Sequence, residues 1–238
     1  MSAPARGMDG AIAAQLAADA RAIAVALDDS GAERLAHFAA LIARWNAKIR
    51  LVGPDDALTI AREQIVDALA FARVVQHAET WWDVGSGAGL PGMVLALLEP
   101  ARRFVLVEPI AKKVAFLEHA AAALALANVA IVHGRVGEGR AGEPASSAPP
   151  LPPRPAWTAT IGAPRAALTR ATFPPALWLP MAERLVGPGG IVVLAVAHEA
   201  ELEPVAGRIA AIARHVYRIP ATGAPRVLVA HRTPPAGA

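Results

Sequence analysis

The chain has 238 residues, 55% of them hydrophobic and 18% charged, and its formal net charge is +3. This length suits one large domain with a small extension. The absence of cysteine excludes disulfides and cysteine-ligated metal sites, and the apolar runs are too short to span a membrane. We therefore expect a soluble cytoplasmic protein without membrane contact, whose nucleic-acid binding, if any, depends on local basic clusters.

The first third of the chain is predicted to be helical. Helices are expected over residues 11–27 and 32–49, and a third one opens at Asp55 and runs toward Val75. In the second helix the apolar residues recur at spacings of three and four, which marks one buried stripe: Leu35, Phe38, Leu41, Ile42 and Trp45. We interpret residues 1–79 as an N-terminal helical extension.

From Thr80 onward, apolar strands alternate with helices. The predicted strands are 80–84, 103–107, 129–132, 157–161, 191–196, 216–219 and 226–230. The predicted helices are 93–98, 111–127, 176–185 and 201–213. This alternation is typical of an α/β fold with a parallel sheet and right-handed crossovers. Residues 80–238 are predicted to form this domain, with a Pro/Ala-rich loop at 139–156.

A glycine-rich turn, residues 83–92 with the sequence DVGSGAGLPG, follows the first predicted strand directly. The dinucleotide fingerprint G-x-G-x-x-G requires a third glycine where this chain has Leu90, which argues against a pyrophosphate cradle and against a nicotinamide oxidoreductase. The G-x-G-x-G spacing suits a nucleoside with a less charged tail, such as S-adenosylmethionine. The residues expected to hold it are Asp83, Gly85, Ser86, Gly87, Gly89 and Leu90.

Glu108 ends the second predicted strand. A carboxylate at this position can accept hydrogen bonds from both hydroxyls of a ribose. Taken alone, Glu108 is equally well explained as a solvated loop acid. The glycine loop upstream of it favours the ribose contact.

Several further segments resemble the bacterial small-subunit ribosomal RNA guanine-N7 methyltransferases, the RsmG (GidB) family. The resemblance extends from about residue 41 to 190. Its most specific parts are the Gly-Leu-Pro-Gly end of the glycine loop and the helix beginning Lys112-Lys113. The other matching residues are Arg44-Trp45-Asn46, Lys48, Asp67, Glu108, Asn128-Val129, Gly134-Arg135-Val136, Arg165-Ala166 and residues 187–190.

The resemblance implies a class I, Rossmann-like methyltransferase fold: a mostly parallel seven-stranded sheet, helices on both faces and an N-terminal helical extension. It implies S-adenosyl-L-methionine as cofactor and ribosomal RNA or the small ribosomal subunit as partner of a monomeric enzyme. By position, Val136 and Gly137 contact the adenine region, and Arg165 falls on the family arginine near the cofactor and the target base.

Methylation of guanine N7 explains the lack of an obvious acid–base pair. N7 carries an exposed lone pair, so the enzyme mainly has to orient the two reacting atoms. Arg165 is therefore the predicted catalytic residue, orienting the guanine through O6. The histidines show no metal-ligand spacing, and we expect no metal.

Basic residues form two clusters that are candidates for binding RNA phosphates. We predict these contacts for Arg44, Lys48, Arg50, Lys112, Lys113 and Arg135. A solvated helix face remains the alternative interpretation of both clusters.

Some positions depart from the family pattern, namely Arg50, Gln64, Ala163-Pro164, Ala197 and Gly137-Glu138. These departures keep two alternatives open. One is a methyltransferase that acts on another RNA or on a small molecule. The other is a non-catalytic RNA-binding relative.

Overall fold

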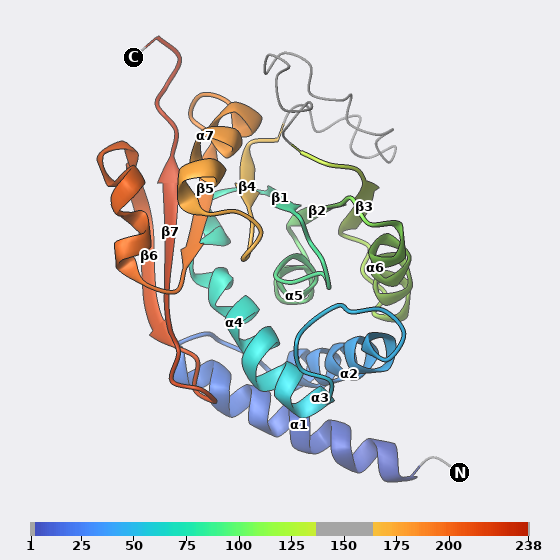
Figure 1. Ribbon diagram of the computed structural model, residues 1–238. Helices are drawn as coiled ribbons and strands as arrows, with labels where there is room; N and C mark the ends of the chain where they lie inside the picture. Colours follow the sequence, from blue (N-terminus) through green and yellow to red (C-terminus); the bar gives the residue numbers. More distant parts are fainter. Residues whose placement is uncertain (1–2, 137–163, 238) are drawn as a thin grey trace.

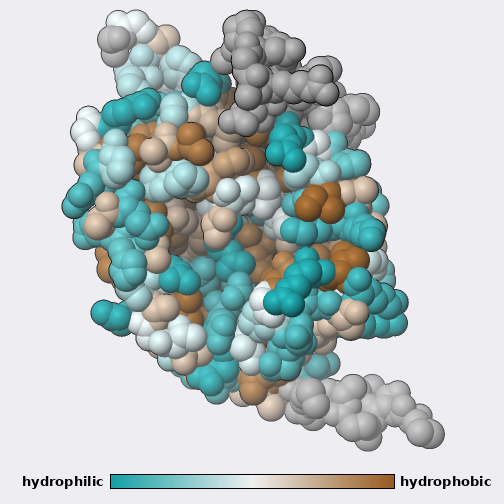
Figure 2. Space-filling view, viewed as in Figure 1, coloured by the Kyte–Doolittle hydropathy of each residue, from teal (hydrophilic) through white to brown (hydrophobic). Residues whose placement is uncertain are grey.

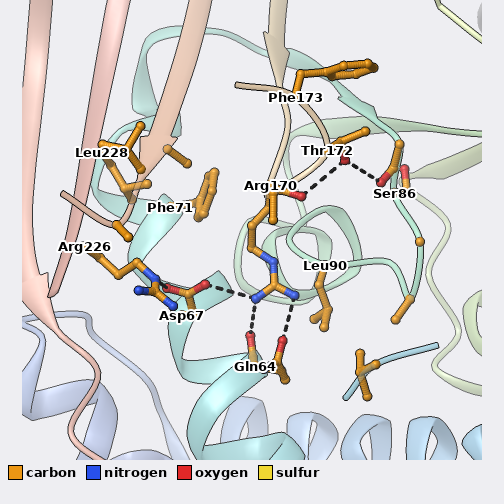
Figure 3. A pocket seen from close by; sticks show the side chains of 18 of the residues that line it. Gln64, Asp67, Phe71, Ser86, Leu90, Arg170, Thr172, Phe173, Arg226 and Leu228 are labelled. Carbon is orange, nitrogen blue, oxygen red and sulfur yellow. Dashed lines mark hydrogen bonds and ion pairs between the residues drawn. The ribbon is translucent and has the colours of Figure 1, made fainter. Parts of the chain in front are cut away.

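The computed structural model describes residues 3–136 and 164–237 (Figure 1). Its N-terminal third is helical, as expected. This third comprises α1 (Ala3–Ala22), α2 (Asp29–Asn46), α3 (Ala57–Thr59), the π-helix η1 (Ile60–Ile65), α4 (Val66–Leu69) and the 3₁₀ turns η2 (Ala70–Arg73) and η3 (Val75–His77). The segment predicted as one helix from Asp55 to Val75 is thus divided. Gln64 in the π-helix and Asp67 in α4 both contact Arg170, which follows β4 (Figure 3).

The sheet has seven strands, as predicted. They are β1 (Thr80–Val84), β2 (Arg103–Glu108), β3 (Val129–His133), β4 (Ala166–Leu168), β5 (Ile191–Val196), β6 (Ala211–Arg218) and β7 (Pro225–Arg232), in the order β3-β2-β1-β4-β5-β7-β6. The first five strands are parallel, and β7 pairs antiparallel with both β5 and β6. The mostly parallel α/β architecture is confirmed.

Helices cover both faces of the sheet (Figure 1). They are α5 (Gly92–Leu98), α6 (Ala111–Ala123), α7 (Pro175–Val186) and the 3₁₀ segment η6 (Glu199–Arg208). Because side chains alternate along a strand, Trp81 packs on the face of α5, α6 and the N-terminal helices, whereas Trp82 packs on the face of α7 and η6. Both tryptophans are buried in the core.

The helical extension shares its core with the sheet. Leu35 and Phe38 of α2 and Ile65 of η1 lie in one hydrophobic cluster with Trp81 and Phe104. The division of the chain into 1–79 and 80–238 stays a prediction, although β1 does begin at Thr80.

Two sequence predictions in the second half need correction or fall outside the described residues. The helix predicted over 201–213 is wrong in its last part, because η6 ends at Arg208 and residues from Ala211 pair with β7. Pro204 and Gly207 disfavour a longer helix there. The strand predicted at 157–161 and the loop at 139–156 lie outside the described residues, and β4 was not predicted.

Asn46, at the end of α2, organises the segment that follows it. Its amide nitrogen donates to the carbonyls of Val52 and Pro54 and to the Asp55 carboxylate, at 2.7–3.2 Å. Its amide oxygen accepts from the backbone N–H groups of Leu51 and Val52, at 2.7 and 3.1 Å. Since Leu51 and Val52 line the main cavity, Asn46 helps to form a wall of the site.

We expect Asn46→Ala to lower the free energy of unfolding by about 2–4 kcal/mol, because it leaves buried backbone donors without partners. Urea denaturation measures this. The exposed Lys48→Ala on the same segment serves as the control and should change stability by at most about 0.5 kcal/mol. Equal stabilities of the two variants would contradict the role assigned to Asn46.

Candidate active site

The glycine loop connects β1 to α5 and turns tightly over the end of β2. Gly85 and Ser86 donate their backbone N–H groups to the Val107 carbonyl at 2.8 and 3.2 Å. Gly85 has φ +76°, and a Cβ there would lie 2.7 Å from Thr172 Cγ2. Only glycine fits this position, because both its positive φ angle and the adjacent Thr172 side chain disfavour a Cβ here.

Asp83 lies underneath the loop and is fully buried. Its Oδ2 accepts from the Gly92 N–H at 2.9 Å, and its backbone carbonyl accepts from the Ser86 hydroxyl at 2.8 Å. Its Oδ1 has no hydrogen-bond partner among the described residues. Burial raises the pKa of Asp83 to about 7, although the Gly92 N–H and the charge of Arg170 oppose this shift.

Glu108 holds the glycine loop from the end of β2. Its carboxylate accepts from the Gly87 N–H at 2.8 Å and from the Ile110 N–H at 2.9 Å, and the residue is only 3% exposed. A carboxylate oxygen has two lone pairs, so each oxygen retains one site for a further donor such as a ribose hydroxyl.

A cavity of about 670 Å³ opens beside the loop, at the carboxyl ends of β1, β4 and β5. Ligands in α/β proteins bind at this edge of the sheet. Of the predicted loop residues, Gly85, Ser86, Gly87 and Leu90 line the cavity, whereas Asp83 and Gly89 do not. The rest of the lining comes from the segment after β4, from the N-terminal helical region and from the hairpin β6–β7 (Figure 3), together with the end of β5, Lys113 of α6 and Glu201 of η6.

Asp67 is the centre of a charged network in this cavity (Figure 3). Its Oδ2 accepts from Arg170 Nη1 at 3.0 Å, and its Oδ1 accepts from Arg226 Nε at 3.1 Å and from the Tyr217 hydroxyl at 2.7 Å. Burial and the Asp67 charge raise the pKa of Tyr217, so this hydroxyl remains a donor. Arg170 also donates to the side-chain oxygen of Gln64 at 3.1 Å.

The segment after β4 presents several polar groups to the cavity. Ala171 has φ +54°, a conformation that is unfavourable for a residue with a Cβ and that is concentrated at functional sites. On one side of this bend, Arg170 points to Asp67. On the other side, the Thr172 hydroxyl contacts the Gly85 carbonyl at 3.4 Å.

The structure does not bring Arg165 to this site. Arg165 precedes β4, so it lies at the opposite edge of the sheet from the glycine loop, and its guanidinium lies beside Gly189. In a parallel sheet the residues that follow the strands meet at one end of the sheet, and the residues that precede them meet at the other. Arg170-Ala171, five residues after Arg165-Ala166, follows β4 and lines the cavity, whereas Arg165 does not.

The other predicted residues occupy different places. Val136 packs on the core face that contains α7, and Gly137 lies outside the described residues. Lys113 lines the cavity. The remaining predicted RNA contacts are all exposed, namely Arg44, Lys48, Arg50, Lys112 and Arg135.

Sequence reasoning missed Arg170, Thr172, Tyr217 and Arg226 as site residues. A signal existed only for Arg170, because the short apolar run Ala166-Ala167-Leu168 before it has the pattern of a buried strand. Tyr217 and Arg226 come from a hairpin whose position relative to Asp67 has no local signature.

No helix among the described residues is long and apolar enough to cross a membrane. They also hold no group of three or more metal-ligating side chains arranged to bind an ion.

The sheet order, with β7 antiparallel between β5 and β6, together with a glycine loop after β1 and an acid ending β2, defines a class I methyltransferase. A solved structure with this fold is the O-methyltransferase TomG from Streptomyces achromogenes, in complex with S-adenosylmethionine. It is 18% identical with a TM-score of 0.54, over 98% of this chain and 100% of that one.

Sequence comparisons identify the family. The family model for rRNA small subunit methyltransferase G (GidB) matches residues 31–148. Ribosomal RNA small subunit methyltransferase G of Myxococcus xanthus is 34% identical, covering 89% of this chain and 93% of the relative. The protein of the same name from an Anaeromyxobacter species is 31% identical and covers 82% of each chain. The chain belongs to the ribosomal RNA small subunit methyltransferase G family.

Asp83 makes stability depend on pH. Its pKa is 3.8 when unfolded and about 7 when folded, so the native state binds the proton more tightly. Its contribution to stability is complete below about pH 4 and is lost as the pH rises to about 7. The loss amounts to about 4 kcal/mol.

Asp83→Asn removes this titration while keeping an oxygen for the Gly92 N–H. We expect the wild type to lose about 4 kcal/mol of stability relative to the variant between about pH 4 and 8, as measured by urea unfolding. A difference that stays constant over this range would show that Asp83 does not titrate in the native state.

Proposed function

We propose that this protein transfers a methyl group from S-adenosylmethionine to N7 of a guanine in small-subunit ribosomal RNA. Family membership supports the reaction and the substrate class. The observation that carries the proposal is the cavity in which the glycine loop faces the fixed guanidinium of Arg170. A ribosomal substrate supports a cytoplasmic location for the proposed reaction.

The cavity fits the cofactor in volume and in polar groups. Its volume of about 670 Å³ lies within the usual range for ligand sites. A Cβ at Gly87 would meet no atom closer than 3.9 Å, so the backbone there borders open space. Gly85, Gly87 and Leu90, which line the cavity, would hold the methionine part. Glu108 does not line the cavity, but its carboxylate binds the Gly87 N–H beside it, and its remaining lone pairs would accept the ribose hydroxyls.

S-adenosylmethionine supplies an electrophilic methyl group on a positively charged sulfur. In the transfer the N7 lone pair forms a bond to the methyl carbon while the carbon–sulfur bond breaks, and the positive charge passes to the methylated guanine. No proton has to move during this step. The residues around the cavity therefore act mainly by bringing the two atoms into line.

Arg170 takes the orienting role that the sequence assigned to Arg165. Three contacts to Asp67 and Gln64 fix its guanidinium, at 3.0–3.3 Å. A guanidinium donor pairs well with O6 of guanine.

The exposed cations beside the cavity would contact the RNA backbone. Trp45 packs on Phe116 with ring centroids 5.6 Å apart, so the end of α2 lies against α6. This contact brings Arg44 and Lys48 near the side of α6, which begins with Lys112 and Lys113. None of these four cations forms an ion pair within the described part of the chain. Figure 2 shows hydrophilic residues over much of this face.

The test uses purified protein, S-adenosylmethionine with an isotopically labelled methyl group, and either small ribosomal subunits or their free RNA. We expect labelled 7-methylguanosine in the nuclease digest, detected by mass spectrometry. If the label appears in another nucleoside, or only in a different RNA, the substrate is not the guanine proposed here. No transfer to any RNA, with intact cofactor binding, would favour a non-catalytic relative.

Gly87→Ala tests the cofactor position. Its φ of +57° imposes about 1 kcal/mol of strain on alanine, and its methyl group enters the cavity. Gly223→Ala is the control, with φ +70° and no atom within 4 Å of the new Cβ, in the loop between β6 and β7. Both variants should lose similar stability, and calorimetric titration should show weaker S-adenosylmethionine binding only for Gly87→Ala. Equal affinities of the two variants for S-adenosylmethionine would contradict the placement of the cofactor at this loop.

Arg170→Lys and Arg165→Lys compare the two candidate arginines. Lysine keeps the charge but loses the forked geometry. We expect kcat/KM for the RNA to fall at least about 10-fold for Arg170→Lys, which corresponds to about 1.4 kcal/mol, and to change less than about 2-fold for Arg165→Lys. The reverse order would return the orienting role to Arg165.

A further inference from the structure

One aromatic side chain that lines the cavity is partly exposed to it and takes no part in the network around Asp67. Three aromatic residues line the cavity, namely Phe71, Phe173 and Tyr217. Phe71 and Tyr217 are buried, at 1% and 7% exposure, and the Tyr217 hydroxyl is bound to Asp67. Phe173 is only half-buried.

The orientation of the Phe173 ring is fixed by its neighbours. It lies parallel to the Trp178 ring, with an interplanar angle of 4° and centroids 6.0 Å apart. Trp178 is buried and donates its indole N–H to the Val193 carbonyl at 2.8 Å, so it does not move freely. Pro174 and Pro175 follow Phe173 and restrict its backbone.

Phe173 also lies close to the predicted reaction centre. It follows Thr172, whose hydroxyl contacts the Gly85 carbonyl of the glycine loop. In Figure 3, Phe173 and Arg170 extend from the two sides of the same short segment, with Thr172 between them. The same short segment therefore presents a flat apolar ring, that of Phe173, and a forked hydrogen-bond donor, that of Arg170.

These two groups complement the two chemical features of a purine base. Proteins that act on a base in RNA stack it on an aromatic ring and read its edge with hydrogen bonds. We propose that Phe173 is the surface on which the target guanine stacks while Arg170 binds its edge. This inference rests on the proposed function and adds a residue that determines how the base is held.

The test separates the aromatic face from apolar packing. Phe173→Leu and Phe173→Met keep apolar contact with Trp178 but remove the ring, whereas Phe173→Tyr keeps it. Leu177→Ala, an exposed residue on the following helix, is the control. For each variant we would measure the thermal midpoint, the affinity for S-adenosylmethionine by calorimetry, and kcat and KM for small-subunit RNA.

We expect the Leu and Met variants to lose roughly 5- to 150-fold in kcat/KM for the RNA, the range found for one lost base–aromatic stack. Phe173→Tyr should remain within about 3-fold of the wild type, and all variants should bind S-adenosylmethionine with unchanged affinity. A purely structural role would instead lower the thermal midpoint and cofactor affinity together.

Wild-type activity of the Leu or Met variant, or an equal loss in the Tyr variant, would overturn the stacking role while leaving the proposed function intact. Absence of RNA methylation by the wild type would overturn the proposed function and the stacking role with it. The two failures are therefore distinguishable in one set of measurements.

Discussion

The architecture of the site depends on one buried carboxylate. Asp67 is 6% exposed and binds two arginines and a tyrosine. A buried charge is tolerated only when its partners compensate the lost hydration. Those partners come from the segment after β4 and from the C-terminal hairpin, so these regions must pack on the N-terminal helices for Asp67 to be buried. The same contacts aim Arg170 into the cavity, which links the stability of the fold to the geometry of the site.

Two other acids, Asp83 and Glu108, lie close to one glycine loop in different environments. Asp83 is fully buried and one of its oxygens has no partner among the described residues; its burial raises its pKa to about 7. Glu108 accepts a backbone N–H at each oxygen. The first acid supports the loop from below, whereas the second joins the loop to the end of β2. Together they explain why the loop keeps its shape around a cavity.

Sequence patterns predicted most of the fold, because apolar alternation and strand–loop–helix order are local properties. They also located the glycine loop, of which Gly85, Gly87 and Leu90 do border the cavity. They failed where two identical dipeptides competed. Arg165-Ala166 and Arg170-Ala171 have the same letters, and only the three-residue strand β4 between them shows which arginine reaches the carboxyl edge of the sheet.

The sequence by itself determined the α/β class, the family resemblance and the loop that faces the cavity, since each of these is written in consecutive residues. Tertiary structure decided which charges meet. Arg170 and Arg226 lie 103 and 159 positions after Asp67 in the chain, and their approach follows from how β4, β7 and the N-terminal helices pack. Phe173 is the least buried of the three aromatic residues that line the cavity, which is why we propose it as the surface on which the base stacks. The contacts between these distant residues are not encoded in the local pattern of the chain.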